Sequence, residues 1–455
     1  MFSVFKNAFK TPDLRSKIFY TLLILLIFRV GAAITVPFLD TDALQRLFPA
    51  FDPATAGAGA NTMFDYFNIL SGGAFSKATI FAMSVTPYIN ASIIMQLLTV
   101  AIPALERMQK EGEEGRKRIG TITRYVTVSL GLLQGTAFYV YLRNADPAPG
   151  AESTERLQIV KYMTGWESWF TAVVIVLVFT AGSALMMWLG EQINEKGIGN
   201  GISMLLFAGI LSGFPTTITT LSAYIKLGLE DASMRHYIYL VPVVVVLFLA
   251  IIAFIVVLNE AERRIPVQYA KRVVGRKMYG GQSTHMPIKV NMSGVLPIIF
   301  ASTILSIPQT IQMFIPSNNI SEFWQGFFNA FSTTGWLYGV LYFLMIIGFS
   351  YFYISIQYNP LEMANNLKKN NGAIPGYRPG KPTSDFIARI ISKIVLIGAL
   401  FLGVIAILPI VFGAATNINI SMGGTSIMIV VGVAIETMRS LESQMLMRHY
   451  KGFLE

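Results

Sequence analysis

The sequence predicts an all-α membrane protein, and three observations lead to this fold class. Hydrophobic residues make up 53% of the 455 residues and charged residues only 13%, which leaves too little polar surface for a soluble protein. Ten separate apolar stretches approach the ~20 residues that a helix needs to cross the hydrocarbon of a bilayer. Lys and Arg are distributed unevenly over the segments between these stretches. We therefore expect ten transmembrane helices.

The ten predicted spans follow the apolar stretches along the chain. They cover residues 18–37, 78–102, 121–142, 169–190, 202–225, 240–258, 295–315, 337–357, 390–412 and 420–438. The first span is not expected to be a cleaved signal peptide, because ILLIFRVGAAITV continues into Pro37 and Phe38 without an Ala-x-Ala cleavage pattern. We expect it to remain in the mature protein.

The distribution of basic residues predicts the orientation of the chain. With the N-terminus inside, the inner segments hold 25 of the 35 Lys and Arg residues, and the outer segments hold 7. Short loops rich in Lys and Arg stay in the cytoplasm, so both termini are expected there. The same bias produces much of the net charge of +10. No nucleic acid is needed to explain this charge, although an RNA-bearing partner is compatible with it.

The first distinctive segment, residues 62–77 (TMFDYFNILSGGAFSK), precedes the second span on the outer side. It is too polar and too broken by glycine to cross the membrane. A short re-entrant element is permitted where protein covers it or where it lines a cavity. Gly72 and Gly73 would allow tight bends in such an element. A mobile plug and an ordinary outer loop both fit this segment.

The second span begins with SVTPYINASIIMQLL, which combines a proline with three uncharged polar residues. Pro87 lacks a backbone donor, so it would kink a helix or start one. Asn90, Ser92 and Gln96 place hydrogen-bonding groups inside the membrane. Such groups tie neighbouring helices together, and they also suit a seam that opens and closes. Both roles remain open at this point.

Two long inner loops, residues 259–294 and 358–389, are too basic and too ordered in pattern to be simple connectors. In the first loop, β-branched and aromatic residues alternate with Lys and Arg around a GRK turn, which predicts a protruding hairpin. In the second, NNGAIPGYRPGKPTSD predicts turns around Arg378. The seven basic residues of the first loop exceed what orientation needs. They favour a docking surface for an acidic or RNA-bearing partner over a loop that only fixes topology.

Cofactor and metal chemistry is not expected. The chain has no cysteine, and its three histidines, His236, His285 and His449, are scattered through loops, so disulfides and the usual zinc sites are excluded. GYRPGKPT (376–383) lacks the spacing and the Ser or Thr of a phosphate-binding loop. GIGNG (197–201) follows a membrane span instead of a strand, which disfavours a dinucleotide site. The sequence therefore predicts neither a cofactor nor an enzyme.

A ten-span solute transporter is the main alternative function. Coupled transporters usually bury Asp, Glu or His near the bilayer midplane, whereas Glu436, close to an inner end, is the only acidic residue in the predicted spans. Arg29 lies deeper, at ~17 Å from the inner end of its span. We expect it to pack against loop carbonyls near the outer face, because a buried charge needs polar partners. Coupled transport is therefore disfavoured.

Four long motifs resemble the SecY family, the pore subunits of the bacterial protein translocon. They are SVTPYINASIIMQLLTV (84–100), MWLGEQINEKGIGNGISMLLFAGI (187–210), YAKRVVGRKMYGGQSTHMPIKVNMSGVLPIIFAS (269–302) and IPGYRPGKPT (374–383). The resemblance implies a channel that passes unfolded secretory polypeptides across the plasma membrane. It also implies lateral release of transmembrane segments into lipid. The implied architecture has two inverted five-helix halves, 1–225 and 240–455, joined by an external hinge at 226–239.

The resemblance also assigns roles to individual residues. An apolar ring at the centre of the pore would consist of Val85, Ile89, Leu206, Ile210, Ile299 and Ile429. Family rings are commonly rich in isoleucine, so Val85 and Leu206 depart slightly from the pattern. The re-entrant segment would be the plug, with Phe64, Phe67, Leu70, Gly72 and Gly73. For any single ring residue, burial in an ordinary helix bundle is the alternative explanation.

The implied gate and docking surfaces lie elsewhere on the chain. The lateral gate would form between the second and third spans on one side and the seventh and eighth on the other, with Gln96 and Ser302 as polar contacts across it. Arg276 and Lys277 occupy loop-tip positions that meet the ribosome, and Arg378 matches an arginine associated with the SecA ATPase. The implied partners are the SecE and SecG subunits, SecA, the ribosome, polypeptides bearing a signal peptide, and membrane lipid. The implied location is the bacterial plasma membrane.

Overall fold

A mostly helical bundle makes up the described part of the chain. The computed structural model describes residues 9–41, 43–44, 68, 71–143, 159–162, 165–230, 235–269, 272–274, 277–279, 283–312, 322–331, 335–416 and 424–451. The helices are α2 (Pro12–Gly31), α5 (Thr86–Ala101), α6 (Pro103–Lys110), α7 (Glu113–Arg143), α8 (Trp166–Lys196), α9 (Gly201–Ser212), α10 (Phe214–Glu230), α11 (His236–Glu260), α12 (Leu296–Gln312), α13 (Glu322–Ala330), α14 (Trp336–Gln357), α15 (Pro360–Lys369), α16 (Lys381–Thr416) and α17 (Gly424–Lys451).

Each of the ten predicted spans contains a described helix. Seven helical segments of the described chain are long and apolar enough to cross a membrane, and the pair of α5 and α6, bent by 100°, would make an eighth. The two remaining spans correspond to α2, which carries Arg29 near its end, and to α12, whose apolar part runs only from Leu296 to Pro308. The chain is thus a multi-pass membrane protein, as predicted.

The first two predicted spans are wrong at their outer boundaries. α2 ends at Gly31, and α5 begins at Thr86 rather than at residue 78. Ala78 and Ser84 have φ values of 41° and 51°, which a right-handed helix cannot contain. The helix instead starts next to Pro87, whose fixed φ and missing N–H suit the first turn, so the prediction that this proline could start a helix is confirmed.

The inner ends of two spans extend further than predicted. α7 begins at Glu113 instead of 121, and α16 begins at Lys381 instead of 390. Their extra turns are polar and basic, so the apolar pattern used to place the spans could not include them. The second inner loop is shorter than expected for the same reason, and it also contains α15.

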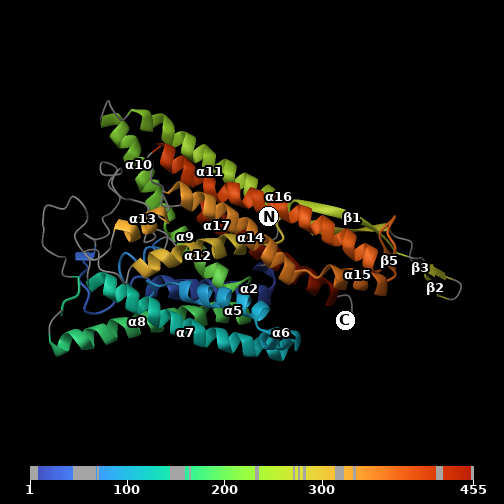
Figure 1. Cartoon of the computed structure of the whole chain (residues 1–455), viewed down its shortest axis with the longest axis horizontal. Helices are drawn as coiled ribbons and strands as arrows, with labels where there is room; N and C mark the ends of the chain where they lie inside the picture. The colour runs from blue at the N-terminus through green and yellow to red at the C-terminus, as the bar shows by residue number, and fades with distance from the viewer. Residues whose placement is uncertain are drawn as a thin grey trace.

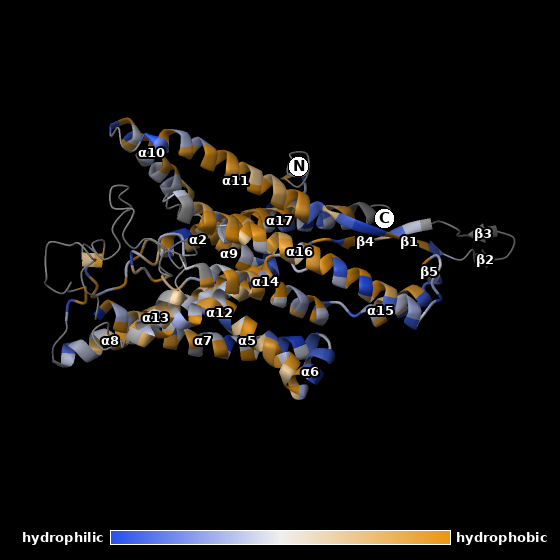
Figure 2. Cartoon of the chain, turned by 45° about the horizontal axis from the view of Figure 1, so that its top comes forward, coloured by the Kyte–Doolittle hydropathy of each residue, from blue (hydrophilic) through white to orange (hydrophobic). Residues whose placement is uncertain are grey.

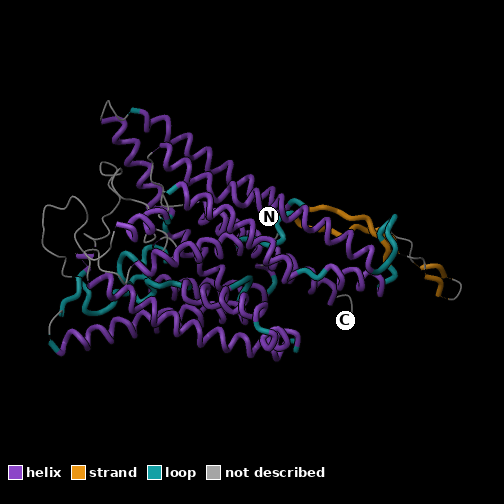
Figure 3. The backbone as a smooth tube through the Cα atoms, in the orientation of Figure 1, coloured by secondary structure: helices purple, strands orange, loops and turns teal. Residues whose placement is uncertain are grey.

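Both inner loops contribute to one small β-sheet. β1 (Glu262–Tyr269) pairs antiparallel with β4 (Ser283–Lys289), and β2 (Arg272–Val274) pairs with β3 (Lys277–Tyr279) further along the same hairpin. The predicted hairpin is confirmed. β5 (Gly372–Ala373), from the second loop, pairs with the other edge of β1, so the strand order is β4-β1-β5. Figure 3 shows these strands at one end of the molecule.

The helices pack in two groups that meet along two seams. In one group α7 packs along both α5 and α8, and in the other α14 packs along both α12 and α16. The groups meet where α9 packs on α17 and where α10 packs on α11. Figure 1 places the sheet, α15 and α6 toward one end, and the C-terminal end of α10 and the start of α11 at the other.

Hydropathy follows this arrangement. In Figure 2, hydrophobic residues cover the middle of the long helices, whereas hydrophilic residues gather on α6, α15 and strands β1 and β4. The sheet end of the bundle is therefore polar and its middle is apolar, as expected for a protein that crosses a bilayer.

Candidate functional site

The six residues of the predicted ring lie in one hydrophobic cluster at the centre of the bundle. Val85, Ile210, Ile429 and Leu206 are at most 3% exposed, and Ile89 and Ile299 are partly buried against them. Val85 is the residue just before α5, and Ile89 lies in its first turn. The other members come from α9, α12 and α17. The structure thus brings together positions that are up to 344 residues apart, from Val85 to Ile429.

The cluster draws on both groups of helices. α5 and α9 contribute from one group, and α12 and α17 contribute from the other. The same cluster also contains residues of α2 and α8, such as Phe28 and Met186, so burial alone would equally suit an ordinary core. What the geometry adds is that aliphatic side chains from both groups converge in one cluster.

The segment before α5 lies against this cluster. Ala74 and Phe81, which are 0% and 2% exposed, belong to it. Residues 71–77 form consecutive turns. Of the predicted plug residues, Gly72 and Gly73 are described, whereas Phe64, Phe67 and Leu70 lie outside the described residues. The described end of the predicted plug segment and the residues that follow it are therefore packed against this cluster.

Gly72 holds this segment against α9 and α2. Its φ is +67°, and a Cβ placed on it would collide with the Ser212 hydroxyl and lie 2.9 Å from the Gly209 carbonyl oxygen. Its own carbonyl oxygen accepts a hydrogen bond from Arg29 Nη1 at 3.3 Å. It also lies 3.3 Å from Ser212 Oγ, whose single proton is shared with the closer Gly209 carbonyl at 2.6 Å. The expectation that Arg29 packs on a loop carbonyl is confirmed. Gly73, with a φ of +83°, has open space around the position of a Cβ.

The predicted gate residues lie in different groups of helices. Gln96 is in α5, where its Nε2 donates to Ser92 Oγ at 3.3 Å. Ser302 is in α12, where its hydroxyl donates to the Ile299 carbonyl at 2.9 Å. Each side chain thus has a partner within its own helix. A contact between Gln96 and Ser302 stays a prediction.

Two of the three predicted docking residues, Lys277 and Arg378, are described, and both lie in the loops that form the strands. Lys277 starts β3, and its backbone pairs with Val274. Arg276 lies outside the described residues. Arg378 is exposed, and its carbonyl oxygen accepts a hydrogen bond from the Thr383 hydroxyl at 2.7 Å, which fixes the turn that was predicted there. β1 connects the two loops, because it pairs with β4 of the first loop and with β5 of the second.

The motif at 187–210 serves as a junction between helices, which sequence reasoning missed. Gln192 accepts a hydrogen bond from the Tyr20 hydroxyl of α2 at 3.0 Å. Asn194 Oδ1 accepts from the backbone N–H of Gly201 at 2.7 Å. Asn200 Oδ1 caps α9 by accepting from the N–H groups of its first turn. Only the last of these has a sequence signal, because Asn is a favoured N-cap residue.

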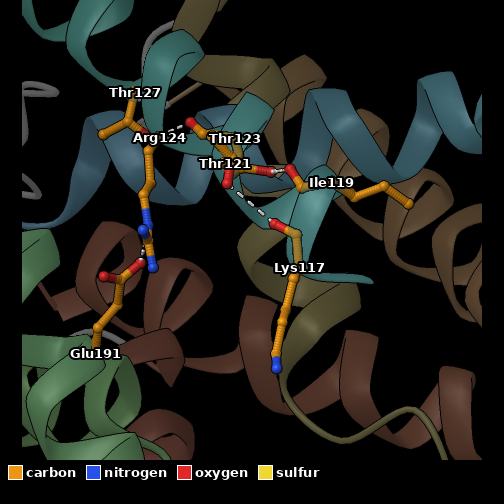
Figure 4. Close-up of polar contacts among 7 residues, drawn as sticks. All are labelled: Lys117, Ile119, Thr121, Thr123, Arg124, Thr127 and Glu191. Carbon is orange, nitrogen blue, oxygen red and sulfur yellow. Dashed lines mark hydrogen bonds and ion pairs between the residues drawn. The ribbon is translucent and has the colours of Figure 1, made fainter. Parts of the chain in front are cut away.

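Glu191, in the same motif, connects α8 to α7. Arg124 Nε donates to its Oε1 at 2.8 Å, as Figure 4 shows. The hydroxyls of Thr121, Thr123 and Thr127 donate to carbonyls one turn earlier in α7. The threonines therefore satisfy their own polar groups, and the ion pair cross-links the two helices.

A second polar cluster holds the base of the β1–β4 hairpin. Arg439 of α17 donates to the Asn259 carbonyl at 3.0 Å and to Glu260 Oε1 at 2.8 Å. Asn291 Nδ2 donates to Asn259 Oδ1 at 2.7 Å, which joins the two stems of the hairpin. Burial lowers the pKa of Lys289, and the charge of Arg439 lowers it further against the opposing acidic neighbours. In the described part of the chain, no group of three or more His, Cys, Asp and Glu could hold a metal ion.

Comparisons with known proteins agree with this architecture. The SecY family model matches residues 79–438. A protein translocase subunit SecY of Streptomyces coelicolor is 42% identical over 459 residues, covering all of both chains. A solved structure of a protein conducting channel is 18% identical, with a TM-score of 0.62 over 94% of this chain and 92% of that one. Sec61 in the canine ribosome-channel complex is 16% identical, with a TM-score of 0.59 over the same shares. The chain therefore belongs to the SecY family.

Proposed function

We propose that this chain is a protein-conducting channel that passes unfolded secretory polypeptides across a bacterial plasma membrane and releases transmembrane segments sideways into lipid. Membership of the SecY family supports this function, and the solute-transporter alternative has no support from the comparisons. The observation that carries the proposal is the apolar cluster with all six ring positions. Its aliphatic side chains come from four helices that no local pattern would bring together.

In this proposal the ring seals the channel by contacts between its apolar side chains. Aliphatic side chains exclude water and ions while they touch one another. Their contacts are non-directional, so they can re-form around an extended polypeptide of any sequence. The segment around Gly72 lies directly against the ring helix α9 and would be the last part of a plug beneath the ring. No energy source is required in the pore itself.

The lateral gate would open between the two groups of helices. The halves proposed are 1–225 and 240–455, with the hinge at 226–239. The seams of α9 with α17 and of α10 with α11 support a hinge on that side, while α5 and α12 pack mainly on α7 and α14. An apolar signal peptide would favour the open state, because it interacts more favourably with a gate that exposes lipid.

Both termini are proposed to be cytoplasmic, on the side of the sheet. Leu14 near the start of the chain packs with Leu441 of α17, and Lys17 Nζ donates to Gln444 Oε1 at 3.2 Å. Arg439 on the same part of α17 contacts the base of the hairpin. These contacts gather both ends of the described chain near the basic loops, which the positive-inside rule assigns to the cytoplasm.

The proposed partners follow from the basic loops and the family. Arg276 and Lys277 would meet the ribosome, and Arg378 would meet the SecA ATPase. Their positive charge suits acidic and RNA-bearing surfaces. The similar Sec61 structure is itself of a ribosome-channel complex. SecE and SecG would complete the membrane complex.

Disulfide crosslinking tests the pore assignment directly, because the chain has no cysteine. We would compare Ile299→Cys with Val245→Cys, whose residue is 43% exposed on α11 and serves as a matched control outside the cluster. A secretory precursor with a single cysteine would be stalled with SecA and ATP in vesicles containing SecE. We expect a disulfide at residue 299 and none at 245, and only with ATP and an intact signal peptide.

Two outcomes would overturn the proposal. One is the lack of a disulfide at residue 299 over a series of stalled lengths, in membranes that translocate the precursor. The other is equal crosslinking at residues 299 and 245. The second result would mean that the precursor contacts the chain without passing its centre.

A further inference from the structure

Helix α13 (Glu322–Ala330) is a short element that the pore does not use. Its 9 residues are too few to cross a bilayer. It connects α12 to α14 in the chain and packs against both. Figure 1 shows it toward the end of these helices that lies away from the β-sheet. A polar surface helix would be expected at such a place, yet this one is rich in aromatic residues.

The aromatic residues of α13 share one side of the helix. At about 100° per residue, the four aromatic positions fall within an arc of roughly 140°, and the three polar positions lie opposite them. The aromatic positions are Phe323, Trp324, Phe327 and Phe328, and the polar ones are Glu322, Gln325 and Asn329. This pattern is typical of a helix that lies in the plane of a membrane surface.

Protein covers only part of the aromatic side. Phe328 is 4% exposed, whereas Phe323, Trp324 and Phe327 are 75%, 50% and 39% exposed. The Trp324 ring lies 5.7 Å from Phe327 and 6.0 Å from Phe328, so the covered and uncovered rings form one continuous surface. The helix thus packs on the bundle through Phe328, at one edge of its aromatic side, and the other aromatic rings of the helix are exposed.

The uncovered rings continue the apolar surface of the neighbouring spans. On α12, Ile307 and Ile311 are 50% and 52% exposed, and on α14, Val340 is 47% exposed. A surface of this kind on a membrane-crossing helix faces lipid. α13 joins the ends of these two helices, so its aromatic rings lie where that surface reaches the edge of the membrane.

A second group of aromatic residues marks the same edge. Trp166 and Trp169, at the start of α8, are 75% and 61% exposed. Figure 1 shows that α8 also starts at the end away from the sheet. Tryptophan is enriched at membrane–water interfaces, because its ring is apolar and its N–H can still reach water or headgroups.

We propose that α13 is an interfacial anchor, with Phe323, Trp324 and Phe327 inserted among lipid headgroups and upper acyl chains on the side away from the sheet. The partner of this surface is the lipid interface itself. Because α12 carries Ile299 and Ser302, the anchor fixes the depth of one wall of the gate. This last consequence rests on the proposed function, whereas the lipid contact does not.

Tryptophan fluorescence in vesicles tests the depth of α13. Four of the 5 tryptophans, Trp166, Trp169, Trp188 and Trp336, would be replaced by Phe so that only Trp324 remains. The full chain would be reconstituted with SecE and SecG into lipids brominated either near the headgroup or near the chain ends. We expect stronger quenching of Trp324 by headgroup-proximal bromines, and a blue-shifted emission.

Two controls calibrate the measurement in a chain in which Trp324 is also replaced by Phe, so that each control carries a single tryptophan. Leu344→Trp places the probe deeper on α14, at a residue that is 58% exposed, and should show the opposite order of quenching. Tyr377→Trp places it in the sheet-side loop, at a residue that is 39% exposed, and should be quenched by aqueous iodide alone. Phe323→Cys with an attached fluorophore provides the same depth measurement if the tryptophan replacements prevent assembly.

Two results would overturn the anchor. Quenching of Trp324 by iodide, without quenching by either brominated lipid, would place α13 in water. Protection from both quenchers would mean that a protein surface covers the rings. Neither result would affect the crosslinking test at residue 299, so failure of the anchor and failure of the channel are distinguishable.

Discussion

In the proposed channel, the conformation of Gly72 would make closure of the pore sensitive to a single methyl group. In Gly72→Ala, the Cβ would collide with the Ser212 hydroxyl and lie 2.9 Å from the Gly209 carbonyl oxygen. Ser212 can rotate away, although it would then lose its contact with the Gly72 carbonyl. The carbonyl of Gly209 belongs to the backbone of α9 and cannot move alone. The segment before α5 must therefore shift away from α9.

Gly73→Ala is a matched control for this substitution. Gly73 has a φ of +83°, and a methyl group on its Cα would have no atom within 4 Å, so this substitution carries only the left-handed backbone cost of about 1 kcal/mol. Gly72→Ala adds overpacking, which typically costs about 1–3 kcal/mol. A difference of about 2 kcal/mol corresponds to roughly a thirtyfold change in the ratio of open to closed pores, if the contact exists only in the closed state.

Ion leak through vesicles that contain the purified complex, without SecA or precursor, would measure this ratio. We expect Gly72→Ala to leak far more than Gly73→Ala, and Gly73→Ala to stay close to the unsubstituted chain. Equal leaks from the two variants would refute the reasoning, because their backbone strain is similar and only the contact with α9 differs.

Three further substitutions test the packing and the electrostatics. Gly182→Ala should lower the thermal midpoint of the detergent-solubilised complex, because its Cβ would collide with the Ile80 carbonyl; an unchanged midpoint would contradict the close packing. Asn200→Ala should cost about 1 kcal/mol through loss of the α9 cap, and Asn200→Ser should recover most of it in the same melting assay. Burial and the charge of Arg439 both lower the pKa of Lys289. Arg439→Gln should therefore raise this pKa and slow acylation of Lys289 below pH 10.5, because less of the amine is unprotonated. Faster acylation of the variant would contradict the assigned direction of the shift.

The membrane helices could be predicted because their signal is local. Each of the ten spans placed by composition and apolar run length contains a described helix, seven or eight of which are long and apolar enough to cross a membrane, and the alternation in residues 259–294 located the hairpin. The two-residue strand β5 has no such signal, since Gly372 and Ala373 form a strand only because β1 offers them an edge. The break before Thr86 was missed for a related reason. The positive φ values of Ala78 and Ser84 are imposed by packing and not by the identity of these residues.

Family motifs predicted part of the site, whereas physical reasoning from the sequence alone predicted very little of it. Val85 and Ile429 look like any buried aliphatic residues in the sequence, and only the fold brings them into one cluster. The sequence predicted the polar contacts even less well. Gln192 and Tyr20 are 172 residues apart, and no spacing rule connects them. Asn200 is the exception, because an N-cap acts on its own helix and can be recognised locally.

The contacts of Gly72 couple the ring to the segment beneath it. α9 carries Leu206 and Ile210 of the ring, and two residues further on it carries Ser212, whose hydroxyl lies 3.3 Å from the Gly72 carbonyl oxygen. A polypeptide that widens the ring must displace α9, and this displacement strains the Ser212 contact and the van der Waals fit of Gly72 on Gly209. The bond from Arg29 would then hold Gly72 to α2 alone. If the proposed ring and plug are correct, we therefore expect widening of the ring and release of the plug segment to occur together, so that a methyl group at Gly72 would open a pore that its ring residues would otherwise keep closed.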